Sequence, residues 1–315
     1  MKIAVLDGYT ANPGDQSWEA LAALGEVSHF DRTSPAQVLE RCQGAEVILT
    51  NKVVLDAAKL EQLPDLKYIG VTATGINIVD IDAANRAGIT VTNVPGYSTD
   101  SVAQLTFALI LELANQVGSH SASVHQGQWA NSSDFSYTLS PQIELSGRKL
   151  GVIGYGDIGQ AVARIGSAMG MDIIVHSRTA AKVPADLFRS LDDVFEQSDI
   201  ISLHCPLTAE NADMVNSERL DRMKPSAWII NTARGPLVNE QALADALNNG
   251  QIAGAGLDVL CKEPMTRDNP LLGAKNCVIT PHIAWATQEA RKRLIDIVAA
   301  NLRLWQNGAP QNVVN

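Results

Sequence analysis

Residues 149–170 read KLGVIGYGDIGQAVARIGSAMG, a short apolar run followed by three closely spaced glycines and an amphipathic segment. The apolar run predicts a buried strand, and the amphipathic segment predicts a helix. Between them, Gly154, Gly156 and Gly159 have the G-x-G-x-x-G spacing, which permits a tight turn, close approach of backbone to a pyrophosphate and close helix–strand packing. The stretch therefore predicts a dinucleotide-binding unit, with Asp157 and Ile158 at the anion-binding start of the helix.

Short apolar runs recur on both sides of this unit and alternate with helical patterns. Such runs are typical of parallel strands that are covered on both faces. Six strands, counting the one at 149–154, match a complete doubly wound nucleotide-binding domain. The runs before the glycine loop are 2–7, 45–50, 66–72 and 89–94, and those after it are 171–176, 199–205, 227–233, 254–260 and 276–282.

The helical segments indicate how the chain divides. A long helix from Asp100 to about Val117 is the first predicted crossing between domains, and a helix capped by Thr287 ends near Gly308. Because this last helix follows the sixth strand, we expect it to return to the first domain. The prediction is an α/β protein of two Rossmann-like parallel-sheet domains with the active-site cleft between them. A discontinuous, flavodoxin-like substrate domain spans 1–99 and 288–315, and the dinucleotide-binding domain spans 100–287.

The composition excludes several classes of protein. The 315 residues carry a formal net charge of −10, which argues against nucleic-acid and anionic-membrane surfaces because both need basic patches. The four cysteines are scattered and predict no metal site, as in proteins of a reducing compartment. The N-terminus lacks a signal-peptide pattern, and the apolar stretch 102–114 is too short to span a bilayer. We expect a cytoplasmic enzyme without a C-terminal regulatory domain.

The segment 173–182, IIVHSRTAAK, bears on which dinucleotide is bound. An acidic residue for the adenosine ribose usually stands in this neighbourhood, but the chain has Ser177 and Arg178 there. Ser177 removes the repulsion of a 2′-phosphate, and Arg178 can meet that phosphate with a planar fork, with Thr179 nearby and Lys182 as a further cation. The segment predicts NADP(H) in preference to NAD(H), although NAD(H) remains possible if Arg178 is only an exposed loop residue.

Three ionisable residues stand at the ends of three consecutive predicted strands. They are Arg234 in NTARGPLV, Glu263 in LDVLCKEP and His282 in ITPHIAW. In open α/β sheets, ligands bind beyond the carboxyl ends of the strands. A guanidinium can bind a carboxylate, an imidazolium can protonate a carbonyl oxygen, and a carboxylate can orient the imidazole. Each residue also has an ordinary structural interpretation, but together they predict the reduction of a 2-keto acid.

The chain resembles the D-isomer-specific 2-hydroxyacid dehydrogenases over essentially its whole length. The stretches that carry the resemblance are TATGINIVDIDAANRAGITVTNVPGYSTDSVAQ, GRKLGVIGYGDIGQAVA, HCPLT, INTARGPLVNE, GLDVLCKEP and TPHIAWAT. The resemblance implies that Arg234, Glu263 and His282 are the catalytic set. It also implies a homodimer formed through the cofactor domain, and a substrate carboxylate bound in the loop of Thr74 by the amides of Gly75 and Ile76.

Further site residues follow from the same motifs. Lys52 is expected to add positive charge from the first domain, and Asp258 to accept a hydrogen bond from the nicotinamide carboxamide. Trp285 resembles the glycerate dehydrogenase and glyoxylate/hydroxypyruvate reductase branch and is assigned to the substrate site, while the role of Trp129 stays open. The remaining cofactor contacts are assigned, together with His282, to Cys205, Pro206, Thr232 and Ala233.

These patterns predict an NADPH-preferring reductase that converts glyoxylate and hydroxypyruvate to glycolate and D-glycerate. Alternatives within the family are D-lactate, phosphoglycerate and phosphite dehydrogenases. A dinucleotide-sensing, corepressor-like binding protein is a further alternative from another class.

Overall fold

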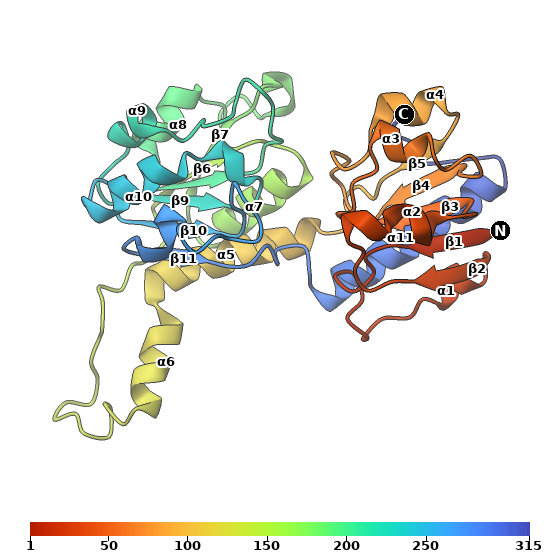
Figure 1. Cartoon of the computed structure of the whole chain (residues 1–315). Helices are drawn as coiled ribbons and strands as arrows, with labels where there is room; N and C mark the ends of the chain where they lie inside the picture. Colours follow the sequence, from red (N-terminus) through yellow and green to blue (C-terminus); the bar gives the residue numbers. More distant parts are fainter. The chain divides into compact units, whose positions relative to one another are not determined.

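A computed structural model describes all 315 residues and divides the chain into two compact units. Unit 1 consists of residues 1–98 and 285–315, and unit 2 of residues 99–284 (Figure 1). The borders differ slightly from those expected from the sequence, because the first crossing helix begins at Thr99 and because Trp285 packs against the core of unit 1. None of the helices is both long enough and apolar enough to cross a membrane.

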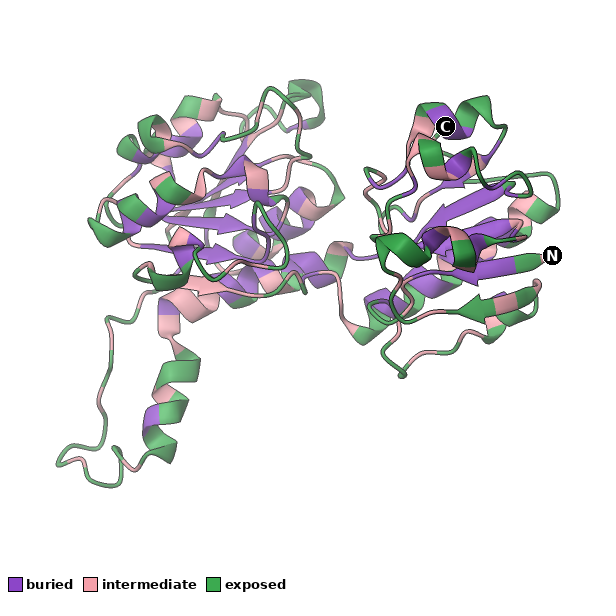
Figure 2. Ribbon diagram, viewed as in Figure 1, coloured by how far each residue is buried: buried purple, intermediate pink, exposed green.

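Unit 1 is a five-stranded parallel sheet in the order β2-β1-β3-β4-β5. Its two faces carry two separate apolar cores, one of which α11 closes (Figure 2). The sequence reasoning missed β2, an edge strand without an apolar run. The strands are β1 (Lys2–Val5), β2 (Glu26–His29), β3 (Val47–Thr50), β4 (Tyr68–Val71) and β5 (Thr90–Thr92); the helices are α1 (Glu19–Ala22), 3₁₀ helix Pro35–Gln37, α2 (Val38–Cys42), α3 (Ala57–Leu60), α4 (Ile81–Arg86) and α11 (Gln288–Gln306).

Unit 2 is a six-stranded parallel sheet in the order β11-β10-β9-β8-β6-β7. Beyond β7, a parallel bridge between Val175 and Phe188 extends this sheet. The sequence reasoning missed this bridge as well. The strands are β6 (Lys149–Ile153), β7 (Asp172–His176), β8 (Ile200–Leu203), β9 (Trp228–Asn231), β10 (Gly254–Leu257) and β11 (Cys277–Ile279); the helices are α5 (Thr99–Asn115), α6 (Val117–His125), α7 (Asp157–Ala168), 3₁₀ helix Ala180–Lys182, α8 (Leu191–Gln197), α9 (Ser217–Asp221), 3₁₀ helix Gly235–Leu237, α10 (Glu240–Asn248) and 3₁₀ helix Pro270–Gly273.

The predicted α/β class with two parallel sheets is confirmed, and so are the local signals that begin and end its helices. The side chain of Asn239 accepts from the Ala242 amide at the start of α10, and that of Thr287 accepts from the Ala290 amide at the start of α11. Beyond the ends of these helices, Gly250 and Gly308 adopt positive φ angles of 70° and 75°. A residue with a side chain is strained in that conformation, so the chain turns away from the helix where glycine stands.

The first crossing helix ends two residues before the approximate end expected at Val117. It ends at Asn115, and Gln116 adopts a left-handed conformation with φ 45° that separates α5 from α6. Helix α6 and the segment after it project from the rest of unit 2, shown in yellow in Figure 1. Ser123 is the one buried residue of α6, and Figure 2 shows the projection as mostly exposed or partly exposed. We call residues 117–143 the arm.

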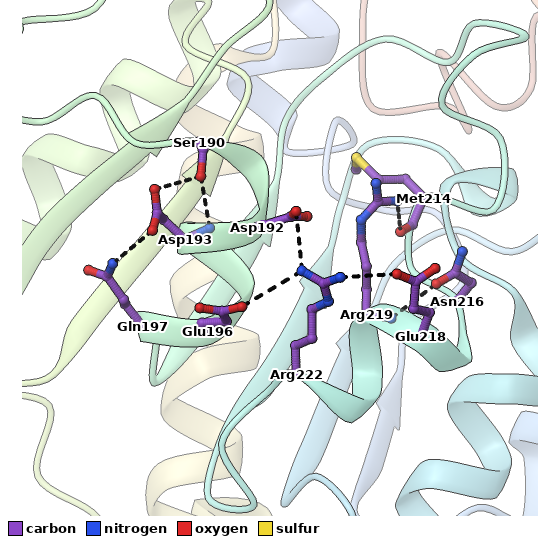
Figure 3. A network of polar contacts seen from close by, with 10 residues as sticks. All are labelled: Ser190, Asp192, Asp193, Glu196, Gln197, Met214, Asn216, Glu218, Arg219 and Arg222. Atoms are coloured by element: carbon purple, nitrogen blue, oxygen red, sulfur yellow. Dashed lines mark hydrogen bonds and ion pairs between the residues drawn. The ribbon is translucent and has the colours of Figure 1, made fainter.

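Polar contacts link two helices on the surface of unit 2. Arg222, directly after α9, lies 3.2 Å from Asp192 of α8 and 3.1 Å from Glu218 of α9. Figure 3 shows these contacts as dashed lines. Glu196 on the next turn of α8 lies 3.7 Å from the same guanidinium. Exposed ion pairs individually contribute little to the free energy of unfolding. This network therefore links α8 and α9, while the apolar core beneath them supplies most of the stability.

Candidate active site

The glycine loop lies at the point where the strand order of unit 2 reverses. Strand β6 pairs with β7 on one side and with β8 on the other, so the ends of β6 and β8 flank a topological switch point. Gly154, with φ 101°, turns there against the loop that follows β8. A Cβ atom on Gly154 would lie 2.5 Å from the carbonyl carbon of His204. Burial lowers the pKa of His204 to about 3, so this neighbour of the glycine loop is neutral, and its Nε2 lies 2.8 Å from Ser202 Oγ.

The other two glycines fit a bound dinucleotide in different ways. Gly156 is exposed and has open space where a side chain would stand, which leaves the backbone accessible to a pyrophosphate. Gly159 is buried, and a Cβ atom there would lie 2.0 Å from the Gly154 oxygen, so only glycine lets α7 pack this closely. The amides of Asp157 and Ile158 have no acceptor within the chain. The residues present therefore fit the diphosphate of a nicotinamide dinucleotide.

The end of β7 holds the segment predicted to select the cofactor. Ser177 Oγ accepts a hydrogen bond from the Thr179 amide at 3.3 Å, so its own proton remains free to be donated. Arg178 is exposed and forms no ion pair within the chain. Lys182 is likewise exposed and forms no ion pair. Burial raises the pKa of Cys205, and the nearby positive charge of Arg178 opposes that shift. The end of β7 and the Cys205–Pro206 loop therefore lie together at the glycine loop.

Arg234 stands in a tight turn after β9. Asn231, fully buried at the end of that strand, donates through Nδ2 to the Arg234 oxygen at 2.9 Å and accepts through Oδ1 from the Ala233 amide at 3.0 Å. The Arg234 side chain is exposed, donates to the Ala233 oxygen at 2.6 Å and has no acidic partner. A Cβ atom on Gly235 would lie 1.9 Å from the carbonyl carbon of Leu260. The turn that carries Arg234 thus packs directly on the loop after β10.

Glu263 and His282 are in direct contact. Glu263 Oε1 accepts from the Leu260 amide at 3.0 Å, which orients the carboxylate, and Oε2 lies 2.6 Å from His282 Nδ1. Both side chains are about one-third exposed, and His282 has an unusual φ of 56°. Because Nδ1 faces a carboxylate it carries the proton, which leaves Nε2 without a partner in the chain and available to a ligand.

Asp258 holds the loop that presents His282. Its carboxylate accepts from Thr280 Oγ1 at 2.6 Å and from the amides of Ile283 and Ala284 at 2.9 and 2.8 Å. Asp258 is 1% exposed, and burial raises its pKa while these hydrogen bonds oppose the rise. Its visible role is to position this loop; the predicted contact with a nicotinamide carboxamide stays a prediction.

The substrate-binding residues predicted outside this cluster lie in unit 1. Lys52, after β3, is exposed and has no acidic partner. Thr74, after β4, donates through Oγ1 to the Val94 oxygen at 2.9 Å, and the amides of Gly75 and Ile76 beside it have no acceptor within the chain. Two adjacent free amides are suited to binding an anion. Trp285 makes an edge contact with Tyr97, at 6.5 Å between ring centroids.

The remaining predicted residues include Thr232, Ala233 and Trp129, whose contacts lie within unit 2. Thr232 is buried and lies 3.0 Å from Thr106, hydroxyl to hydroxyl, next to Ala233. Trp129 lies on the arm, where its ring is half-exposed and Nε1 donates to the Phe135 oxygen at 3.0 Å. The sequence reasoning overlooked Asn231, although a polar residue closing an apolar strand was a usable signal.

The arrangement in unit 2 combines an unpaired guanidinium with a carboxylate–imidazole pair, beside a loop suited to a dinucleotide. Such a set can bind a carboxylate and exchange a proton with a neighbouring oxygen, which are the requirements for interconverting a keto group and a hydroxyl.

Comparison with known proteins agrees with this chemistry. Residues 107–284 match the model of the D-isomer specific 2-hydroxyacid dehydrogenase NAD binding domain. The chain is 48% identical to a hydroxypyruvate reductase of Blautia hydrogenotrophica, with all of both chains covered. It is 41% identical to a glycerate dehydrogenase of Methylorubrum extorquens, over 92% of each chain. Among solved structures, an acyclic imino acid reductase in complex with NADPH and D-Arg matches over all of both chains, with a TM-score of 0.87 and 29% identity. The chain thus belongs to the D-isomer-specific 2-hydroxyacid dehydrogenase family and is an NAD(P)-dependent oxidoreductase.

Proposed function

We propose that the chain is an NADPH-preferring reductase of small 2-keto acids, which converts glyoxylate to glycolate and hydroxypyruvate to D-glycerate. The observation that carries the proposal is the 2.6 Å contact between Glu263 and His282, on a loop packed against the turn of Arg234. Relatives named hydroxypyruvate reductase and glycerate dehydrogenase support these substrates.

His282 supplies the proton in this reaction. Reduction adds a hydride to the keto carbon and a proton to the keto oxygen; the bound nicotinamide supplies the hydride. Nε2 of the protonated imidazole gives its proton to the oxygen, and the ring becomes neutral until solvent reprotonates it. Glu263, held by the Leu260 amide, orients the imidazole and keeps Nδ1 protonated throughout.

Cationic and dipolar groups bind the substrate. The guanidinium of Arg234 has no acidic partner, so it is free to bind the substrate carboxylate and to polarise the adjoining carbonyl. In unit 1, the free amides of Gly75 and Ile76 and the ammonium of Lys52 are proposed to bind a substrate carboxylate. Trp285 is assigned to the apolar part of the substrate site.

Ser177 and Arg178 confer the preference for NADPH. The unpaired Arg178 guanidinium and the free proton of Ser177 would bind a 2′-phosphate, which an aspartate at this position would repel. The double variant Ser177→Asp/Arg178→Ala is expected to lower kcat/KM with NADPH relative to kcat/KM with NADH, with a change in the ratio of about tenfold or more. Arg189→Ala, at a partly exposed arginine whose amide donates to the Val175 oxygen of the same strand, controls for the loss of an arginine nearby. An unchanged ratio in the double variant contradicts the assignment.

A steady-state kcat/KM panel tests the substrate. Glyoxylate, hydroxypyruvate, pyruvate and phenylpyruvate are each assayed with NADPH and with NADH. The proposal expects the two small substrates with NADPH to give the highest values. If the protein binds NADPH but reduces neither glyoxylate nor hydroxypyruvate, the proposal is refuted. A preference for pyruvate or phenylpyruvate would instead assign the chain to another branch of the family.

We also propose that the chain forms a homodimer through unit 2, with the arm in the interface. Asp134 is the one Asp, Glu, Lys or Arg among residues 117–143, whereas 18% of the whole chain is charged. The arm exposes large apolar side chains, and depletion of charge with exposed aromatic rings is typical of an interface core. These side chains are Val117, Val124, Trp129, Phe135 and Leu139, of which Phe135 is 91% exposed.

The oligomeric state tests this proposal. Phe135→Glu places a charge at the most exposed apolar site of the arm and is expected to convert a dimer to a monomer in size-exclusion chromatography with light scattering. Val313→Glu, at an exposed apolar residue of unit 1, is the matched control and leaves the mass unchanged. A monomeric wild type, or a dimer that withstands Phe135→Glu, contradicts the assignment of the arm.

A further inference from the structure

A chain of polar contacts joins the ends of the central strands of unit 1. Asp7, just after β1, accepts through Oδ1 from the Asn51 amide at 2.8 Å and through Oδ2 from the Lys52 amide at 2.6 Å. The two donors, Asn51 and Lys52, follow β3, which pairs with β1. The order β2-β1-β3-β4-β5 reverses between these two strands. Asp7 therefore occupies the switch point of unit 1, the place where open α/β sheets bind ligands.

Asn51 continues the chain toward β4. It is 7% exposed, and its Nδ2 donates to the Thr72 oxygen at 2.6 Å. One residue further along, the Val53 amide donates to Thr50 Oγ1 at 3.1 Å. The three consecutive amides of residues 51–53 are thus all bound by side chains. The backbone under Lys52 is held in place, and none of these amides is free for a ligand.

The next loop is held from its other side. The Ala73 oxygen accepts from the Val94 amide at 3.0 Å, and Asn93 Nδ2 donates to the Thr74 oxygen at 2.8 Å. Together with the bond from Asn51 to Thr72, these contacts fasten the loop to the ends of both β3 and β5. The amides of Gly75 and Ile76 are among those of this loop that have no acceptor within the chain. Side chains at this sheet edge bind backbone groups, and the free donors include the amides of Gly75 and Ile76 and the Lys52 ammonium.

We propose that Asp7 and Asn51 are positioning residues for anion binding by unit 1. Asp7 sets the Lys52 loop, and Asn51 keeps that loop in register with the free amides of Gly75 and Ile76. The identity of the anion as a 2-keto acid carboxylate rests on the function proposed above. Dipolar groups that are already oriented bind an anion without reorganising, so loosening the frame weakens binding in the ground state and in the transition state alike.

The test separates binding from chemistry. Asp7→Asn replaces one acceptor by a donor that faces an amide, and Asn51→Ala removes the bond to Thr72. Both variants are expected to raise KM for glyoxylate and Kd for oxalate about tenfold, as expected for one lost charge-assisted or buried hydrogen bond, with kcat changed less than about twofold. Kd for NADPH is unchanged, because the groups that fit the dinucleotide belong to unit 2.

Asp56→Asn is the matched control. Asp56 caps α3 in the same unit by accepting from the Lys59 amide, and asparagine caps equally well, so KM and Kd stay at wild-type values. If Asn51→Ala does not fold, Asn51→Ser replaces it, with the same split expected. Hydrogen exchange at the bonded amides of residues 51–53 and of Thr72 is expected to quicken in the Asp7 and Asn51 variants only.

Unchanged KM and oxalate Kd in both variants overturn the proposal, as does a parallel loss of kcat and of NADPH affinity, since that indicates general damage. A wild type that does not bind oxalate overturns it as well. A wild type that binds oxalate but reduces no keto acid refutes the proposed function instead, and the oxalate Kd values then decide the role of Asp7 and Asn51.

Discussion

The carboxyl edges of the two parallel sheets use the same topology for different chemistry. In unit 2, ionisable side chains stand ready for a ligand: the Arg234 guanidinium is unpaired and the His282 Nε2 is free. In unit 1, the side chains of Asp7 and Asn51 are bound to backbone, and the free groups at the ends of β4 and its loop are amides. An edge that exchanges protons needs titratable groups, whereas an edge that only binds an anion can use oriented dipoles.

This contrast predicts that changes in unit 2 lower kcat and changes at the edge of unit 1 raise KM. The largest effect is expected for His282→Ala, which removes the proposed proton donor. We expect kcat/KM to fall at least about 100-fold, because general acid catalysis contributes that much or more. Steady-state kinetics measure the loss, with exposed His125→Ala on the arm as the control. Activity near that of the wild type removes His282 from its role.

A second prediction concerns how the edge of unit 2 is assembled. Gly235→Ala forces a Cβ atom against the Leu260 backbone, at 1.9 Å from its carbonyl carbon, and so separates the turn of Arg234 from the loop of Glu263. The free energy of unfolding is expected to fall by about 2 kcal/mol, in the range for overpacking, and kcat to fall with it. Chemical denaturation and kinetics measure the two effects.

Gly273→Ala is the control for this substitution. Gly273 has open space where a Cβ would stand and a φ angle that other residues adopt. It is expected to leave stability and kcat nearly unchanged. Equal behaviour of the two variants would show that close packing at Gly235 does not assemble the site.

The smallest expected effect belongs to unit 1 and depends on pH. Arg291, whose side chain is 8% exposed, binds Asp15 through both guanidinium arms, at 2.5 and 2.6 Å. The hydrogen bond from Arg291 holds the pKa of Asp15 below its usual value of 3.8. A carboxylate with a lowered folded-state pKa stabilises the fold above the unfolded value, and this contribution is lost as the pH falls through the folded value.

Asp15→Asn is therefore expected to lower Tm by about 2 °C well above pH 3.8, with a smaller difference from the wild type below it. Thermal unfolding followed across this pH range measures both differences, and kcat stays constant at neutral pH. Asp296→Asn, which removes an exposed pair with Lys292, provides the control. A difference in Tm that grows as the pH falls would have the wrong sign for this pair.

The parts of the fold that sequence reasoning found and missed differ in burial. Strands β3, β4, β8 and β9 are buried at every residue, and each appears in the sequence within a mostly apolar run. Strand β2 is an edge strand of mostly exposed residues, and the bridge at Phe188 is too short for a pattern. An edge strand gains its structure from pairing with a neighbour, which the composition of a segment does not reveal.

The candidate site divides in the same way. Motifs and strand ends are local, so the sequence located the glycine loop, Ser177 with Arg178, and the residues Arg234, Glu263 and His282. Asn231 and Asp7 were missed, because what distinguishes them is the backbone they bind after the chain has folded.

The sequence by itself determined which elements form, which family the chain belongs to and which side chains carry protons and charge. Those properties follow from patterns within a few residues, namely periodicity, caps and glycine spacing. Only the tertiary structure decided that Glu263 Oε2 lies 2.6 Å from His282 Nδ1 and that the Asp258 carboxylate binds the loop of His282. It also decided that the amides of Gly75 and Ile76 have no acceptor within the chain. These depend on contacts between segments far apart in the chain, where a hydrogen bond requires distances and directions that spacing along a sequence does not specify.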